Sequence, residues 1–293
     1  MTNSQPSVVC FGEALWDCLP DARCIGGAPL NVAYHLAQLG CRAWPMSAVG
    51  CDEFGRELLE QTQEWGLPTD LICELSDKQT GRANVTLQDG VPTFEVVADV
   101  AWDYISLPAA WPADCQPVDA IVFGSLAERS SHNRKSLQEL FAALPAALKV
   151  FDANLRPPFD DLAVIWSLAK VADVLKLNDE EVAVLLGREV ALADIETCAR
   201  ELQKETGCER ICVTAGGAGG GLLLHDAWYW VDAVPVQVRD TVGAGDSFLA
   251  TLLQGLLLVP GQPDATLKRA AALASFVAGS EGATPKHEPD SFA

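Results

Sequence analysis

DTVGAGDSFLATLL, residues 240–253, runs from a glycine-rich turn into an apolar helical pattern. Gly243, Ala244 and Gly245 carry small side chains or none, so their backbone N–H groups can approach a ligand closely. The start of a helix attracts anions, because its first N–H groups lack partners within the helix and the helix dipole adds positive charge there. Asp246 nevertheless places a carboxylate in this predicted anion site.

Two interpretations explain Asp246. As a general base, an ionised Asp246 would take a proton from a hydroxyl, while the amides hold the oxygens of a phosphoryl group that moves in line toward that hydroxyl. The carboxylate would then touch only the acceptor end and would not compete with the phosphoryl group. As a helix cap, Asp246 would only accept a backbone hydrogen bond. The local sequence leaves both interpretations open.

The composition limits the classes of protein and partner. The chain has 293 residues, of which 49% are hydrophobic and 20% charged, as expected for a soluble globular protein with a substantial core. Its formal net charge of −20 argues against nucleic acid or an anionic membrane as a main partner. An anionic ligand must therefore be held by local N–H groups or single cations.

We expect a cytoplasmic protein with reduced thiols. The first residues lack a basic start followed by an apolar stretch, and the longest apolar runs are too short to span a membrane. The ten cysteines include no Cys-x-x-Cys pair, and a chain of this size does not need disulfides. Reduced thiols in the core are the expectation.

Short β-branched runs alternate with helical patterns along most of the chain. SVVCF (7–11) precedes APLNVAYHLAQLG (28–40), and DVLKLN (173–178) precedes DEEVAVLLG (179–187). This order predicts an α/β fold with a mostly parallel sheet covered by helices on both faces. We expect a single domain over residues 1–293, with its ligands beyond the carboxyl ends of the strands.

Two predicted hairpins interrupt this order. GRANVTLQDGVPTFEVVAD (81–99) predicts two strands joined at Asp89-Gly90, and GLLLHDAWYWVDAV (221–234) predicts two strands joined at His225-Asp226. The first hairpin could be a lid over a ligand or an ordinary edge hairpin.

Paired glycines also precede the helix of CIGGAPLNVAYHLAQLG. After Gly27, Pro29 suits the first helical turn, and the amide of Asn31 lies one step further along. Upstream, Asp17 ends the strand pattern of FGEALWD. Because sugar hydroxyls both donate and accept hydrogen bonds, such a set of side chains suits a sugar. A helix cap and a surface acid are the alternative.

Three further motifs follow predicted strands. Asn178 and Glu181 in LKLNDEEVAVLLG could order the water shell of Mg²⁺, or could simply cap the next helix. The glycines of VTAGGAGGG could let a nucleotide approach the backbone, or could form a flexible turn; neither a Walker loop nor a GxGxxG fingerprint fits there. Arg156 in FDANLRPPFDD could bind a hydroxyl, a carboxylate or a phosphate, or could form a structural ion pair.

The order and spacing of these motifs resemble the ribokinase-like carbohydrate kinase family, often called PfkB, over essentially the whole chain. GGAPLNVAYHLAQLG is similar to the N-terminal signature of that family, and DTVGAGDSFLATLL to its highly specific C-terminal signature. KLNDEE matches the Asn-x-x-Glu motif between them.

The resemblance implies a ribokinase-like three-layer α/β sandwich with a small β lid and an ATP-dependent kinase for a sugar or related alcohol. The lid would come from roughly residues 13–25 and 70–100, and several members dimerise through it. The implied roles are Asp246 as base; the amides of Gly243, Ala244 and Gly245 as anion hole; Asp17, Gly27, Asn31 and Arg156 at the acceptor; Thr214, Gly216 and Gly219 at the nucleotide; and Asn178 with Glu181 at Mg²⁺.

Within the family, Ala28-Pro29 and DANLRPPF are similar to fructokinases and also to 2-keto-3-deoxygluconate kinases. Ribokinases usually carry lysine at the place of Ala28, and no cluster of cations suits the phosphate of a phosphofructokinase substrate. Fructose is therefore the expected acceptor, with the keto-acid as the nearest alternative. Another sugar or nucleoside kinase, a non-catalytic sensor and a nicotinamide-dependent enzyme are weaker alternatives.

Two departures from the family pattern concern ligands. TAGGAGGG contains more glycine than the usual Thr-x-Gly-x-x-Gly, which leaves the nucleotide contacts open. Many relatives bind a monovalent cation near the anion hole, and Asp240 with GSEGATP (279–285) could form that site. Val242 differs from the threonine frequent in cation-activated relatives, so the sequence leaves potassium open.

Overall fold

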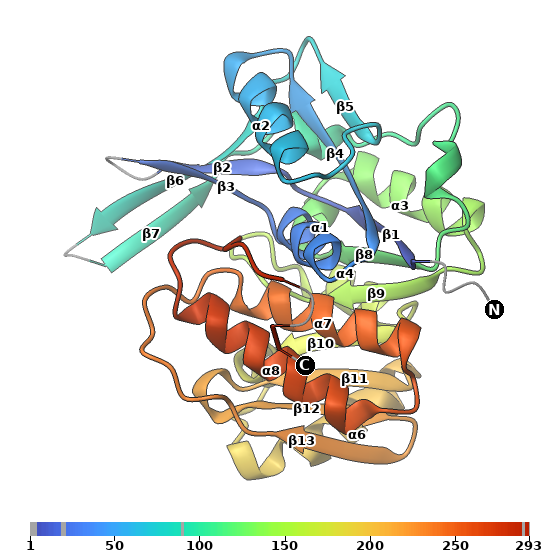
Figure 1. Cartoon of the computed structure of the whole chain (residues 1–293), viewed down its shortest axis with the longest axis vertical. Coiled ribbons are helices and arrows are strands. Elements are labelled where there is room, and N and C mark those ends of the chain that lie inside the picture. Colours follow the sequence, from blue (N-terminus) through green and yellow to red (C-terminus); the bar gives the residue numbers. More distant parts are fainter. Residues whose placement is uncertain (1–4, 19–21, 89–90, 289–290, 293) are drawn as a thin grey trace.

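A nine-stranded sheet organises the chain, whose computed structural model describes residues 5–18, 22–88, 91–288 and 291–292 (Figure 1). Its strands lie in the order β13-β12-β11-β10-β9-β8-β1-β4-β5. All neighbours are parallel except β12, which runs antiparallel to β11 and β13. The strands are β1 (Ser7–Phe11), β4 (Arg42–Gly50), β5 (Ile72–Leu75), β8 (Ala120–Gly124), β9 (Leu148–Asp152), β10 (Val174–Asn178), β11 (Arg210–Thr214), β12 (Gly220–Leu224) and β13 (Ala227–Val231).

Helices cover both faces of this sheet, as the sequence predicts. One face carries α1 (Ala28–Gln38), α7 (Ala244–Leu258) and α8 (Pro263–Ala278). The other carries α3 (Ser131–Ala143), α4 (Leu162–Ala169), α5 (Asp179–Leu186) and α6 (Ile195–Thr206), while α2 (Glu53–Glu64) lies beside β4. In β1, Val8 packs toward α1 and Val9 toward the opposite layer. A strand buried on both faces needs apolar residues at every position, which explains its continuous apolar run.

A second, four-stranded sheet projects from one side of the molecule, to the left in Figure 1. Its order is β3-β2-β6-β7, and its strands are β2 (Leu15–Cys18), β3 (Arg23–Gly26), β6 (Gly81–Gln88) and β7 (Val91–Val96). β6 and β7 pair antiparallel, while their expected turn at Asp89-Gly90 lies outside the described residues. The expected lid boundaries need a correction: Ile72–Leu75 is β5, which pairs with β4 in the large sheet.

Other local expectations have mixed outcomes. The hairpin through His225-Asp226 is confirmed, because β12 and β13 pair antiparallel around it. All ten cysteines are free thiols, but the expectation that they lie in the core is wrong for Cys24 and Cys51, which are exposed. Within the described residues, no helix has the length and apolarity needed to cross a bilayer.

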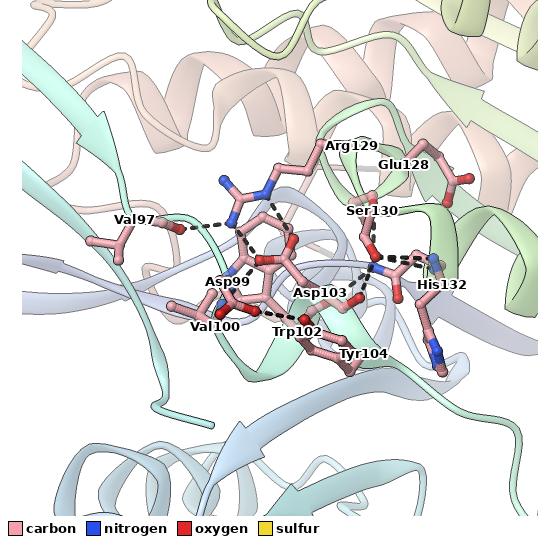
Figure 2. Close-up of polar contacts among 12 residues, drawn as sticks. Val97, Asp99, Val100, Trp102, Asp103, Tyr104, Glu128, Arg129, Ser130 and His132 are labelled. Carbon is pink, nitrogen blue, oxygen red and sulfur yellow. Dashed lines mark hydrogen bonds and ion pairs between the residues drawn. The ribbon is translucent and has the colours of Figure 1, made fainter. Parts of the chain in front are cut away.

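A buried ion pair ties the end of the small sheet to the connections of the large one (Figure 2). The Nε and Nη2 atoms of Arg129 donate to the carboxylate of Asp103 at 2.7 and 2.8 Å. Nη2 also donates to the carbonyl of Val97, directly after β7, and the guanidinium carbon lies 3.9 Å from the Trp102 ring centre. Such planar, bidentate pairing favours one geometry, so Arg129 fixes where the chain leaves the small sheet.

Candidate functional site

The first turn of α7 forms the centre of the candidate site. Gly243 caps the helix with φ of 78°, a left-handed conformation that favours glycine, and a Cβ there would lie 2.6 Å from the carbonyl oxygen of Ala283. The helix starts at Ala244, so Asp246 is its third residue and not its N-cap. The half-buried Asp246 instead accepts a hydrogen bond from Nδ2 of Asn31 at 2.9 Å. The capping interpretation of Asp246 is therefore wrong.

The amides expected to form an anion hole differ in their partners. The N–H of Ala244 donates to the carbonyl of Thr241 at 3.3 Å. The N–H groups of Gly243 and Gly245 have no hydrogen-bond partner in the described chain. Two of the three amides are thus free for an anion, and the third makes only a long bond.

Asp17 lies in the small sheet, within the residues expected to form the lid. It belongs to β2, which is separate from β1, because β1 stops at Phe11. Its Oδ2 lies 2.3 Å from the point where a Cβ on Gly26 would be, so the missing side chain of Gly26 makes room for the carboxylate. Burial raises the pKa of Asp17 to about 6.

Glu13, which the sequence analysis missed, is a buried acid beside this group. Its Oε1 accepts from the N–H of Ala28 at 3.1 Å, and its Oε2 has no partner in the described chain. Its carbonyl oxygen lies 2.3 Å from the Cβ position of Gly27, whose φ is 114°, so only glycine fits there. Burial raises the pKa of Glu13 to about 7.

Electrostatics couple the acids of the site. Burial, with a contribution from Asp152, raises the pKa of Asp246 to about 6, while Lys176, Asn31 and Arg156 oppose the rise. The positive charge of Arg156 also opposes the rise in the pKa values of Glu13 and Asp17 that burial causes. Arg156 itself is exposed, forms no ion pair with any described residue, and donates from Nη1 to the carbonyl of Leu155 at 3.0 Å. It is therefore available to a ligand.

Asn178 and Glu181 form a helix cap at the start of α5. The Asn178 side chain accepts from the Glu181 N–H at 2.8 Å, and Glu181 Oε2 accepts from the Asn178 N–H at 2.8 Å. Glu181 Oε1 accepts from the N–H of Leu155 at 2.8 Å. The capping alternative thus describes their geometry, and only the remaining lone pairs of Glu181 could face water around Mg²⁺. No three His, Cys, Asp or Glu side chains of the described residues are grouped to hold a metal directly.

The expected nucleotide residues lie beyond β11. Thr214 ends that strand directly opposite Asn178 of β10. Gly216 has φ of 49° and open space around its Cβ position. Gly219 has φ of 125°, and its Cβ would lie 2.0 Å from the carbonyl oxygen of Val231. Gly216 therefore leaves room for a ligand. At Gly219 the backbone of Val231 fills the space that a side chain would need, so only glycine fits there.

Asp240 and the 279–285 segment come together, as the sequence suggested. A hollow of about 360 Å³ is lined by Arg239, Asp240 and Glu281. Asp240 Oδ1 accepts from the N–H of Val242 at 3.0 Å. The geometry is compatible with a cation at this hollow, and that role stays a prediction.

Lys176 and Asp152 form a buried ion pair that the sequence analysis also missed. Nζ of Lys176 lies 2.8 and 3.1 Å from the two carboxylate oxygens of Asp152. A signal was present, since a lysine inside the apolar strand VLKLN needs a buried acid as partner, and Asp152 ends the neighbouring strand pattern.

Comparisons with known proteins show the family and the fold of the chain. The family model for "pfkB family carbohydrate kinase" matches residues 7–290. A fructokinase of Klebsiella pneumoniae is 30% identical over 270 residues, covering 87% of this chain and 85% of the relative. The structure of a fructokinase with bound ATP from Xylella fastidiosa has a TM-score of 0.84 at 26% identity, covering 96% of this chain and 94% of the other. An uncharacterized sugar kinase from Pyrococcus horikoshii in complex with ATP has a TM-score of 0.82 at 27% identity, covering 97% and 96%. These likenesses confirm the expected ribokinase-like α/β fold.

Replacing Gly243 by alanine tests the close approach at the start of α7. Alanine at positive φ costs about 1–2 kcal/mol, and the contact with Ala283 adds overpacking, so we expect Gly243→Ala to lower the free energy of unfolding by roughly 3 kcal/mol. Gly40→Ala is the matched control, because Gly40 has φ of 82° but open space at its Cβ position. Urea unfolding measures both; equal losses would contradict the close approach.

Proposed function

This chain belongs to the pfkB family of carbohydrate kinases, and we propose that it transfers the γ-phosphoryl group of ATP to fructose, giving fructose 6-phosphate and ADP. The family makes the chain a phosphotransferase that acts on a sugar hydroxyl. The observation that carries the proposed mechanism is the Asp246 carboxylate, held by Asn31 beside the free amides of Gly243 and Gly245.

In this mechanism Asp246 accepts the proton of the attacking hydroxyl. Because its pKa is about 6, the carboxylate is mostly ionised at neutral pH and still basic enough to take a proton. Asn31 donates to Oδ2 and thereby leaves Oδ1 to face the acceptor. The amides of Gly243 and Gly245, and of Ala244 if its long bond opens, hold the phosphoryl oxygens.

Binding roles follow from the same arrangement. Asp17, Gly27, Asn31 and Arg156 are the proposed acceptor contacts. Thr214 and Gly216, with Gly219 shaping the turn, are the proposed nucleotide contacts. Asn178 and Glu181 would orient the water shell of Mg²⁺, which when bound with ATP neutralises charge on the phosphate oxygens. Asp240 would hold a potassium ion.

Charge favours a neutral sugar over a keto-acid. The charge of Arg156 acts on the carboxyl groups of Glu13, Asp17 and Asp246, and the charge of Asp246 also acts on Glu13. An anionic acceptor would be repelled by this group, whereas fructose would not. The fructokinase names of the Klebsiella and Xylella relatives support the same choice. The unpaired Arg156 is the observation that favours 2-keto-3-deoxygluconate as second candidate.

Initial rates with each acceptor separately test the choice of fructose. ADP release from MgATP should be at least tenfold faster in kcat/KM with fructose than with 2-keto-3-deoxygluconate, ribose or a nucleoside. A control without acceptor measures ATP hydrolysis. Rapid turnover of the keto-acid beside none of fructose would reject the proposal.

The small sheet is the proposed lid and dimer contact. It carries Asp17 on β2, so it borders the acceptor site, and its outer strands β3 and β7 have unpaired edges in the described chain. Such edges can pair with a second copy. Sedimentation velocity should show a homodimer; a monomer at high protein concentration would contradict it. The cytoplasm, where ATP is available, is the proposed compartment.

A further inference from the structure

Lys176 is a charged residue in the interior of the large sheet. Lys176 is 6% exposed, and its partner Asp152 is 3% exposed. Burial disfavours the charge of Lys176, but Asp152 raises its pKa, so the side chain remains an ammonium group. The ammonium group has three N–H donors. In the described chain it donates to the two carboxylate oxygens of Asp152.

This ammonium group lies against the first turn of α7. Lys176 and Asp152 are directly opposed on the parallel strands β10 and β9, near their carboxyl ends. Nζ of Lys176 is 3.2 Å from the point where a Cβ on Gly245 would be, and this is the nearest atom to that point. The ammonium therefore occupies the space that a side chain at residue 245 would need, next to the free N–H of Gly245.

We propose that Lys176 is an electrostatic positioning residue for phosphoryl transfer, whose fixed charge beneath Gly245 stabilises the negative charge of the phosphoryl group while it passes from ATP to the sugar. This inference rests on the proposed roles of the α7 amides and Asp246. A helix N-terminus alone supplies only about half a unit charge. The Lys176–Asp152 pair is a fixed dipole whose positive end faces Gly245, because Nζ of Lys176 lies 3.2 Å from the Gly245 Cβ position and no Asp152 atom lies within 4 Å of it. This dipole adds to the field of the helix N-terminus without reorganisation at the moment of transfer.

Phosphoryl transfer breaks one bond to phosphorus and forms another. The bond between the γ-phosphorus and the bridging oxygen breaks, and its electron pair stays on ADP. A lone pair of the sugar hydroxyl oxygen forms the new bond to phosphorus, and the hydroxyl proton passes to Asp246. Charge on the three equatorial oxygens is what the amides and Lys176 face.

A purely structural role for the pair is the competing explanation. Buried ion pairs contribute little net stability, because desolvation offsets their attraction, and apolar replacement of both partners is often neutral or stabilising. A structural pair could therefore be exchanged for Met and Leu with no loss of turnover. A functional pair could be exchanged without loss of the fold but not without loss of catalysis.

The double variant Lys176→Met/Asp152→Leu separates these explanations. We expect cooperative unfolding like the wild type, KM values for MgATP and sugar within about threefold, and kcat reduced about 100-fold, as for loss of one oxyanion contact. Affinity for ADP plus aluminium fluoride in the presence of sugar should fall similarly, with ADP affinity alone unchanged. Lys149→Met, on β9 but partly exposed, is the matched control and should keep wild-type kcat.

The polar pair Lys176→Gln/Asp152→Asn serves if the apolar pair fails to fold, with the same expected loss of kcat. A kcat within threefold of the wild type, or equal losses of ADP affinity and kcat, overturns the proposal, as does failure of both double variants to fold. Wild-type turnover is measured first on the full sugar panel. If fructose fails but another sugar is phosphorylated, the proposed substrate is wrong and Lys176 is tested with that sugar.

Discussion

The hydrogen bond from Asn31 to Asp246 is the interaction on which the rest of the site depends. This bond is 2.9 Å long and joins α1 to α7, two helices that begin more than two hundred residues apart in the chain. Both helices begin directly after a glycine with positive φ, Gly27 at 114° and Gly243 at 78°. Each glycine admits a close backbone neighbour, so the two helix starts are fixed where they can share one carboxylate.

The features that the sequence predicts well are those set by local chemistry. The strand and helix order, the glycine-led start of α1 and the hairpin at His225-Asp226 all follow from patterns within a few residues. The Lys176–Asp152 pair depends on the register between β9 and β10, and no local pattern contains that register. The break between β1 and β2 is also absent from the local pattern, because FGEALWD continues the strand pattern while the chain starts a new sheet after Gly12.

A carboxylate in the first turn of a helix can either cap backbone N–H groups or remain partly free. Glu181 has both carboxylate oxygens bonded to backbone N–H groups, while Asp246 has one oxygen bonded to a side chain. Each carboxylate is the third residue of its helix, and the neighbouring elements decide which groups it contacts. In a chain of net charge −20, the proposed phosphate contacts depend on local groups: the free amides of Gly243 and Gly245 and the unpaired Arg156.

The kcat of Asp246→Asn, measured beside its affinity for ADP, tests the central claim most directly. Asparagine keeps the size of the side chain and removes the basic oxygen that would take the proton. The account predicts a fall in kcat of about 10²–10⁴-fold with an unchanged dissociation constant for ADP. A variant that retains more than a tenth of the wild-type kcat would contradict the assignment of Asp246 as the base.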